Sequence, residues 1–191
     1  MNIPGNLQRR PFFAPIGLLA VAVTAGLLVM IALVAMAWFL ITSTPTTVIV
    51  VRHAAQLLGD GTDPPLSPEG EMRAATLAQT LGDTELKSRV AAIYVTSDLR
   101  SRSTAAPLAQ RLRLTPEVVS EDDPRSLARH LLREHAGETT LVIGHAGTVP
   151  AIVSALSGEK DIPAVAGSDY SAMYVVTIPR IGRAEVLREN Y

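Results

Sequence analysis

The sequence contains no cysteine, which excludes disulfide bonds and thiolate metal ligands. This absence is compatible with any redox compartment and therefore says nothing about location. Lysine is scarce, occurring only at Lys87 and Lys160, so arginine supplies nearly all of the positive charge. An arginine bias favours planar recognition of anions, although ordinary surface charge produces the same bias.

A basic face is also lacking. From residue 46 onward the chain carries 15 Lys and Arg against 18 Asp and Glu, a net charge of about −3. Nucleic-acid binding usually requires a basic surface, so nucleic acid is not an expected partner. The 191 residues suffice for one ordinary domain plus an appendage, and they carry no signal for the oligomeric state.

Charge is absent from residues 16–41, where Thr24 is the only polar side chain. A helix of this length spans roughly 39 Å, which exceeds the roughly 30 Å hydrocarbon core of a bilayer. We predict a transmembrane helix over 16–41, because the segment has no amphipathic face that would suit a core helix. A cleaved secretory signal is the alternative, with 35–37 as the small-residue site, but the apolar run is too long for one.

The flanking charges predict the orientation of this helix. Arg9 and Arg10 precede it, whereas the next positive charge is Arg52. The positive-inside rule places a tail of residues 1–15 in the cytoplasm and the rest of the chain outside it, in the periplasm or the extracellular space. Residues 42–47 are expected to form a linker, and 48–191 the domain that carries the function.

Short apolar runs alternate with helical patterns through this domain. A continuous β-branched run at 46–51 is typical of a strand buried on both faces of a parallel sheet. We expect further strands at 90–95, 117–119, 141–143 and 173–178, the last an edge or late strand, and helices at 68–82, 103–112, 124–135 and 149–156. This alternation predicts a three-layer α/β/α fold with a mostly parallel central sheet.

Basic side chains follow three of the predicted strands. Arg52 and His53 come directly after the first strand, Arg100 follows the second, and His145 follows the strand at 141–143. The carboxyl ends of parallel strands share one edge, so these four residues are expected to meet in one cleft. Two arginines can hold the oxygens of a phosphate, and a histidine between them can attack phosphorus.

Four segments resemble the motifs of the histidine phosphatase superfamily, also called the phosphoglycerate mutase-like or branch 1 histidine phosphatases. The resemblance covers about residues 46–190, and four motifs in the right order are far more specific than one. The segments are Arg52-His53-Ala54; Leu66-Ser67-Pro68-Glu69-Gly70 with Arg73-Ala74; Tyr94-Val95-Thr96 leading to Arg100 and Thr104-Ala105; and Leu141-Val142-Ile143-Gly144-His145 with Thr148-Val149-Pro150.

The resemblance implies a role for each matching residue. His53 would be the nucleophile that becomes phosphohistidine, and Arg52 and Arg100 would hold the phosphoryl oxygens. His145 would donate a hydrogen bond to the phosphate, and backbone N–H groups near Gly147 would add to the anion site. The substrate would be a small phosphorylated molecule, and neither a metal nor another cofactor would be required.

Two positions depart from the family pattern, and one role is unassigned. Ala55 stands where the family often has glutamate, and Gly147 stands where asparagine is common. The family usually takes its general acid from an Asp or Glu elsewhere in the chain. Glu121 is the candidate here, with Asp122 and Asp123 close behind, although the default reading of these acids is a loop and a helix cap.

The register of the second arginine is ambiguous by sequence alone. Counting back four residues from Thr104 selects Arg100, whereas counting from the preceding strand leaves Arg102 as a competitor. The Thr-Ala pair is the more specific anchor, so Arg100 is favoured.

Several alternatives remain open. A catalytically impaired phosphate-binding or regulatory module competes with a phosphatase that hydrolyses a phosphomonoester, and Ala55 favours that module. A zinc site built on His53 and His145 is disfavoured, because the sequence has no cysteine and no paired-histidine metal motif. His130 and His135 are predicted to be solvated surface residues.

Overall fold

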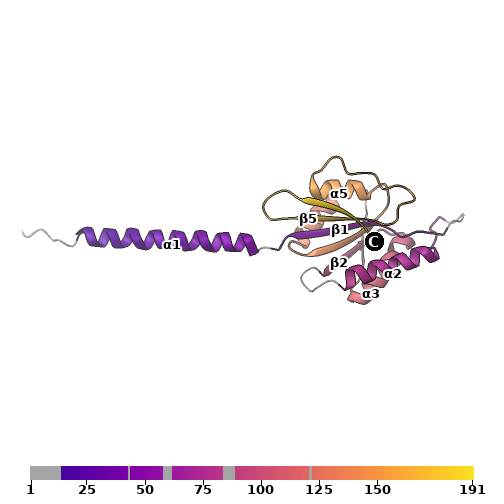
Figure 1. Cartoon of the computed structure of the whole chain (residues 1–191), viewed down its shortest axis with the longest axis horizontal. Helices are drawn as coiled ribbons and strands as arrows, with labels where there is room; N and C mark the ends of the chain where they lie inside the picture. Colours follow the sequence, from indigo (N-terminus) through magenta and orange to yellow (C-terminus); the bar gives the residue numbers. More distant parts are fainter. Residues whose placement is uncertain (1–13, 43, 58–61, 84–88, 121) are drawn as a thin grey trace, which may run out of the picture. The chain divides into compact units, whose positions relative to one another are not determined.

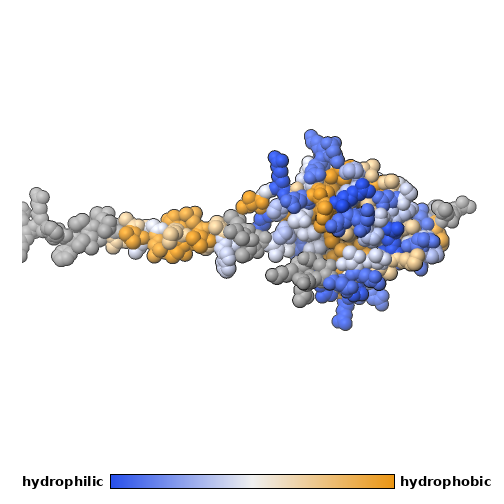
Figure 2. Space-filling model, viewed as in Figure 1, coloured by the Kyte–Doolittle hydropathy of each residue, from blue (hydrophilic) through white to orange (hydrophobic). Residues whose placement is uncertain are grey.

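The computed structural model describes residues 14–42, 44–57, 62–83, 89–120 and 122–191. The chain divides into two compact units, Met1–Ser43 and Thr44–Tyr191. The described part of the first unit is helix α1 (Ala14–Thr42), which has a mean hydropathy of 2.6 over Ala20–Phe39. None of that stretch is buried, and Figure 2 shows its apolar side chains as a continuous exposed surface. The helix is long and apolar enough to cross a membrane.

A mixed sheet of six strands forms the centre of the second unit (Figure 1). Its order is β3-β2-β4-β1-β5-β6. The first four of these strands are mutually parallel, whereas β5 pairs antiparallel with β1 and β6 pairs antiparallel with β5. The strands are β1 (Thr46–Arg52), β2 (Val90–Val95), β3 (Glu117–Val118), β4 (Thr139–Gly144), β5 (Ala172–Ile178) and β6 (Glu185–Asn190).

Helices cover both faces of this sheet, because β-branched residues of β1 alternate between two cores. On one face Ile49 and Val51 pack with helices α2 (Pro68–Gly82) and α3 (Leu99–Leu112). On the other face Val48 and Val50 pack with helices α4 (Pro124–Glu134) and α5 (Val149–Ser157). The predicted three-layer α/β/α fold is therefore confirmed, with the sheet mixed and four of its strands parallel.

The strand at 173–178 was expected to be an edge or late strand. β5 is late in the chain, but it is not an edge strand, because it pairs with β1 on one side and with β6 on the other. The edge strand is β6, which the sequence did not predict. Its residues Glu185–Asn190 are mostly charged or polar and mostly exposed, so they show neither a buried run nor a regular apolar alternation.

A close approach of helix α2 to the end of β1 fixes the chain that leads from the strand. Ser67 caps the helix by accepting a hydrogen bond from the Gly70 backbone N–H at 3.2 Å. The Ser67 N–H donates to the carbonyl of Ala55 at 2.9 Å. A Cβ atom at Gly70 would overlap that carbonyl oxygen, so this position requires glycine.

Candidate active site

The parallel pairing of β1 with β4 brings the first two predicted residues beside the third. Arg52 pairs with Gly144, and the His53 backbone N–H donates to the Gly144 carbonyl at 3.0 Å. His145 follows directly, and its ring lies edge-on to that of His53 with the centroids 5.2 Å apart. Arg52 and His53 are both buried. The structure thus brings these three residues together at the carboxyl end of the sheet.

The His53 imidazole has a defined proton arrangement. Its Nδ1 atom lies 2.8 Å from the carbonyl oxygen of Ala54, which only accepts hydrogen bonds, so Nδ1 carries the proton and Nε2 the lone pair. Burial is the main cause that lowers the pKa of His53 from 6.5 to about 4, and the positive charges of Arg52 and Arg100 add to it. The hydrogen bond to Ala54 opposes this only in part. At neutral pH His53 is an uncharged imidazole with an available nucleophilic nitrogen.

Thr104 holds the loop after His53 against helix α3. Its Oγ1 accepts from the Ala54 N–H at 2.9 Å and donates to the Arg100 carbonyl at 2.7 Å. Thr104 and Ala54 are both fully buried, so neither group has water as an alternative partner. One hydroxyl therefore joins the residue after His53 to Arg100, which carries the second guanidinium group.

Arg100, Asp98 and His145 form a compact polar cluster. Arg100 Nη2 lies 3.1 Å from His145 Nε2, and Asp98 Oδ2 lies 2.9 Å from the same nitrogen. The other carboxylate oxygen of Asp98 is 3.4 Å from Arg100 Nη2. The structure brings Arg100 rather than its competitor Arg102 beside His145, since Arg102 is exposed on α3. Sequence reasoning missed Asp98, whose place before a helix is typical of a capping residue.

Arg52 orders a distant loop as well as the strand end. Its Nη1 atom donates to the carbonyls of Ala166, Gly167 and Asp169 at 3.2, 2.8 and 3.3 Å. The guanidinium carbon lies 3.9 Å from the ring centroid of Tyr170, a stacked cation–π contact. The Tyr170 ring is also 6.1 Å from that of His53. No sequence signal identified Tyr170, because the contact depends on a loop far along the chain.

Two guanidinium donors at this end of the sheet lack an acceptor within the described part of the chain. These are the buried Nε atoms of Arg52 and Arg100. An unsatisfied buried donor is costly, and a bound anion would remove the cost for both. The donor set of the cluster therefore suits a group with several acceptor oxygens, such as a phosphate.

The remaining predicted site residues are Gly147 and the acidic residues at 121–123. Gly147 is exposed in the turn before α5, and nothing lies within 4 Å of the position that a Cβ atom would take. Glu121 lies outside the described residues. Its neighbour Asp123 caps α4 by accepting from the Ser126 N–H at 3.0 Å, and Asp122 binds the Ser120 hydroxyl.

The prediction that His130 and His135 are solvated surface residues needs correction. The half-buried His130 ring lies edge-on to that of Tyr94, with the centroids 5.9 Å apart. His135 has two polar partners. Its Nε2 atom lies 2.7 Å from the Tyr94 hydroxyl oxygen, and its Nδ1 lies 2.8 Å from Glu138 Oε2. It is therefore a half-buried bridge between β2 and the turn before β4, not a solvated surface residue. Among the residues that the structure describes, no group of three or more His, Asp or Glu side chains is arranged to hold a metal ion.

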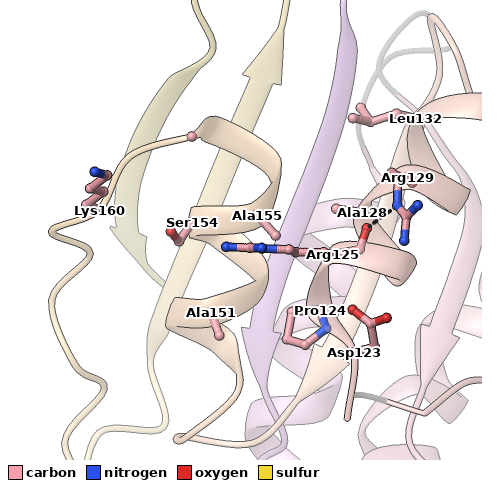
Figure 3. Close-up of a pocket in the computed structure, with 11 residues that line it drawn as sticks. Asp123, Pro124, Arg125, Ala128, Arg129, Leu132, Ala151, Ser154, Ala155 and Lys160 are labelled. Carbon is pink, nitrogen blue, oxygen red and sulfur yellow. Dashed lines mark hydrogen bonds between the residues drawn. The ribbon is translucent and has the colours of Figure 1, made fainter.

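A groove of about 740 Å³ lies elsewhere, between helices α4 and α5 (Figure 3). Arg125 extends across it toward Ser154 and Ala155, and Lys160 lies at its far side. None of the four residues clustered at the carboxyl end of the sheet lines this groove. No histidine of the described chain lines this groove, so it is not the candidate for phosphoryl transfer through histidine.

Comparison with known proteins agrees with this geometry. A family model described as the histidine phosphatase superfamily (branch 1) matches residues 48–123, which include Arg52, His53, Asp98 and Arg100. The resemblance to the histidine phosphatase superfamily that the motifs indicated is thereby confirmed over this segment. His145 lies beyond the matched segment, and the β1–β4 pairing brings it beside Arg52 and His53. A comparison with curated proteins found no match.

Solved structures share the histidine phosphatase fold. The protein histidine phosphatase SixA, in complex with tungstate, is 23% identical over 75% of this chain and 96% of its own, with a TM-score of 0.63. YhfR from Bacillus stearothermophilus is 16% identical over 75% and 96% of the two chains, with a TM-score of 0.60. A mycobacterial glucosyl-3-phosphoglycerate phosphatase is 16% identical over 76% and 99%, with a TM-score of 0.59. These identities show a common fold and leave the substrate open.

Proposed function

We propose that this protein is a phosphatase that hydrolyses a phosphomonoester through a phosphohistidine intermediate on His53. The observation that carries the proposal is the protonation state of His53. Its Nδ1–H is committed to the Ala54 carbonyl, and its lowered pKa keeps Nε2 unprotonated at neutral pH. A neutral imidazole beside two guanidinium groups has the chemistry that attack on a phosphate requires.

Each step follows from these groups. His53 Nε2 forms a bond to phosphorus while the bond from phosphorus to the leaving oxygen breaks, and that oxygen takes up a proton. Arg52 and Arg100 hold the phosphoryl oxygens, and His145 donates a hydrogen bond to the negative charge that develops. Water then attacks the phosphohistidine, which releases inorganic phosphate and restores the free imidazole.

The presence or absence of an acid that protonates the leaving group decides which class of substrate can react. Burial works to raise the pKa of Asp98, but the Thr96 hydroxyl and the charges of Arg100 and His145 outweigh it, so the pKa lies below its ordinary value. An ionised Asp98 has no proton to donate at neutral pH, which leaves Glu121 as the candidate. Without a general acid, the site favours substrates with good leaving groups, such as aryl phosphates.

A substrate screen follows from this point. Three of the similar structures carry the name SixA, a histidine phosphatase, and another is named a glucosyl-3-phosphoglycerate phosphatase. Phosphohistidine peptides, phospho-sugars and phospholipid head groups are therefore the first panel to offer this protein.

We further propose that helix α1 is an uncleaved anchor. Arg9 and Arg10 precede it, so the positive-inside rule favours a cytoplasmic amino terminus and a catalytic unit on the other side of the membrane. Protease added outside intact cells is then expected to digest an epitope tag at the carboxyl terminus but not one at the amino terminus. The opposite protection pattern would overturn the orientation.

Turnover of an aryl phosphate by the full chain in detergent micelles tests the enzymatic proposal. His53→Ala is expected to remove all measurable turnover, because it removes the nitrogen that the proposal requires to attack phosphorus. His130→Ala is the matched control, since it removes a histidine of helix α4 that lies outside the cluster. Circular dichroism checks that both variants fold. Undiminished turnover in His53→Ala would overturn the assignment.

A second candidate function is a module that binds phosphate without hydrolysing it. The ionised state of Asp98 and the alanine at position 55 favour it, since neither residue supplies a proton donor. Incubation with a ³²P-labelled phosphoester separates the two candidates. The enzyme becomes labelled on His53 by an acid-labile, base-stable bond, whereas the binding module retains no covalent label.

A further inference from the structure

Asp98 lies at the N-cap position of helix α3 but does not cap the helix with its side chain. Its side chain accepts no hydrogen bond from the helix. The capping role belongs to Asp63, whose two carboxylate oxygens lie 3.0 and 2.9 Å from the Leu99 backbone nitrogen. With the helix end satisfied by another residue, the Asp98 carboxylate is turned toward Arg100 and His145 instead.

The contacts of Asp98 show why it lies there. A carboxylate only accepts hydrogen bonds, so the 2.9 Å contact with His145 Nε2 requires that this nitrogen carries a proton. Arg100 Nη2 lies 3.1 Å from the same nitrogen, so two hydrogen-bond donors face each other. Their electrostatic repulsion is unfavourable unless an anion lies close to both. Asp98 is that anion in the described chain.

We propose that Asp98 is an internal anion that occupies the phosphate-holding groups Arg100 and His145, and that a substrate phosphate must displace it to bind. This inference rests on the proposed function, because it takes Arg100 and His145 as ligands of the phosphoryl group. Asp98 is then a specificity residue, because weakly charged ligands compete less well with its carboxylate for Arg100 and His145 and so bind with lower affinity.

The contacts also allow the displacement. The Asp98 side chain is 29% exposed, and its 3.4 Å contact with Arg100 is long for an ion pair. It keeps a hydrogen bond from the Thr96 hydroxyl at 3.1 Å, which remains when Arg100 and His145 turn to a ligand. A phosphate offers more acceptor oxygens than a carboxylate and can also serve the Nε atoms of Arg52 and Arg100, which have no acceptor among the described residues.

Calorimetric titration of inorganic phosphate into the full chain in detergent micelles tests this proposal. Asp98→Ala is expected to bind phosphate about tenfold more tightly than wild type, the size of one charge-assisted contact, and Asp98→Asn by a smaller factor. The KM for an aryl phosphate should fall in parallel with the phosphate Kd, while kcat does not rise. Asp63→Asn is the control, because it removes a carboxylate beside the same helix end that contacts Leu99 instead.

The outcomes separate the two proposals. Unchanged or weaker phosphate binding in Asp98→Ala, with aryl phosphate turnover intact in wild type, would overturn the internal anion and leave the phosphatase standing. An equal gain in phosphate affinity in Asp63→Asn would assign the effect to the removal of any negative charge near this helix end. That result would also overturn the internal anion. Absence of both phosphate binding and turnover in wild type would overturn the proposed function itself, and this inference with it.

Discussion

At the scale of single residues, His53 couples the stability of the fold to pH. Its pKa in the folded chain is about 4, against 6.5 ordinarily, so between these values the unfolded chain binds more protons. The contribution to stability is therefore complete above about pH 6.5 and is lost as the pH falls toward 4. At pH 5 the loss amounts to up to about 2 kcal/mol, since each pKa unit is worth about 1.4 kcal/mol.

Chemical denaturation of wild type and His53→Gln at pH 7 and pH 5 measures this contribution. Glutamine does not titrate, so its variant should lose less stability than wild type between the two pH values. Other titrating groups are common to both proteins, and the difference isolates His53. Parallel pH dependences in the two proteins would contradict the lowered pKa.

Most of the clustered residues were predictable from the sequence, but not all of their partners were. Arg52, His53 and His145 were predictable because each lies at or just after the end of a strand. Asp98 was not, because an aspartate before a helix normally caps it, and only the folded chain places Asp63 in that role. The stacking of Tyr170 on Arg52 likewise depends on long-range loop packing that no local pattern encodes.

At the scale of elements, the contact between α2 and the chain after β1 is the tightest constraint near the cluster. Gly70→Ala would force a Cβ atom into the Ala55 carbonyl, two residues after His53. We expect a destabilisation of about 1–3 kcal/mol from overpacking, although alanine is the better helix former by about 1 kcal/mol. Aryl phosphate turnover should fall as well, because the shifted carbonyl belongs to the loop that follows the nucleophile.

The matched control is Gly147→Ala, where a Cβ atom meets nothing within 4 Å. Its unfolding midpoint should stay close to that of wild type, whereas Gly70→Ala should unfold at lower denaturant concentration. Equal midpoints for the two variants would mean that α2 moves away from the loop without cost.

The elements themselves were predictable where burial imposes a pattern. Strand β1 is an unbroken β-branched run because both of its faces are covered, and the helical faces of α2 and α5 repeat with the helix period. Strand β6 escaped because an exposed edge strand needs no apolar alternation, and charged residues such as Arg188 protect such an edge from association. Because β6 was not predicted, the antiparallel pairing of β5 with β6 was not predicted either.

At the scale of the whole molecule, the two units are expected to be separable. Both main core clusters of the fold lie within Thr44–Tyr191, and none of the apolar stretch of α1 is buried. Removal of residues 1–43 should therefore leave the melting temperature of the α/β unit within about 2 °C of its value in the full chain.

Phase separation in a nonionic detergent measures the role of the removed segment. The full chain is expected in the detergent-rich phase, because α1 presents an apolar stretch of 20 residues that no described part of the chain buries, and the truncated chain in the aqueous phase. Mass spectrometry of the full chain recovered from membranes distinguishes an anchor from a cleaved signal, since an anchor retains Arg9 and Arg10. Cleavage after Ala37 would return the mass of a chain that begins at Trp38 and would overturn the anchor.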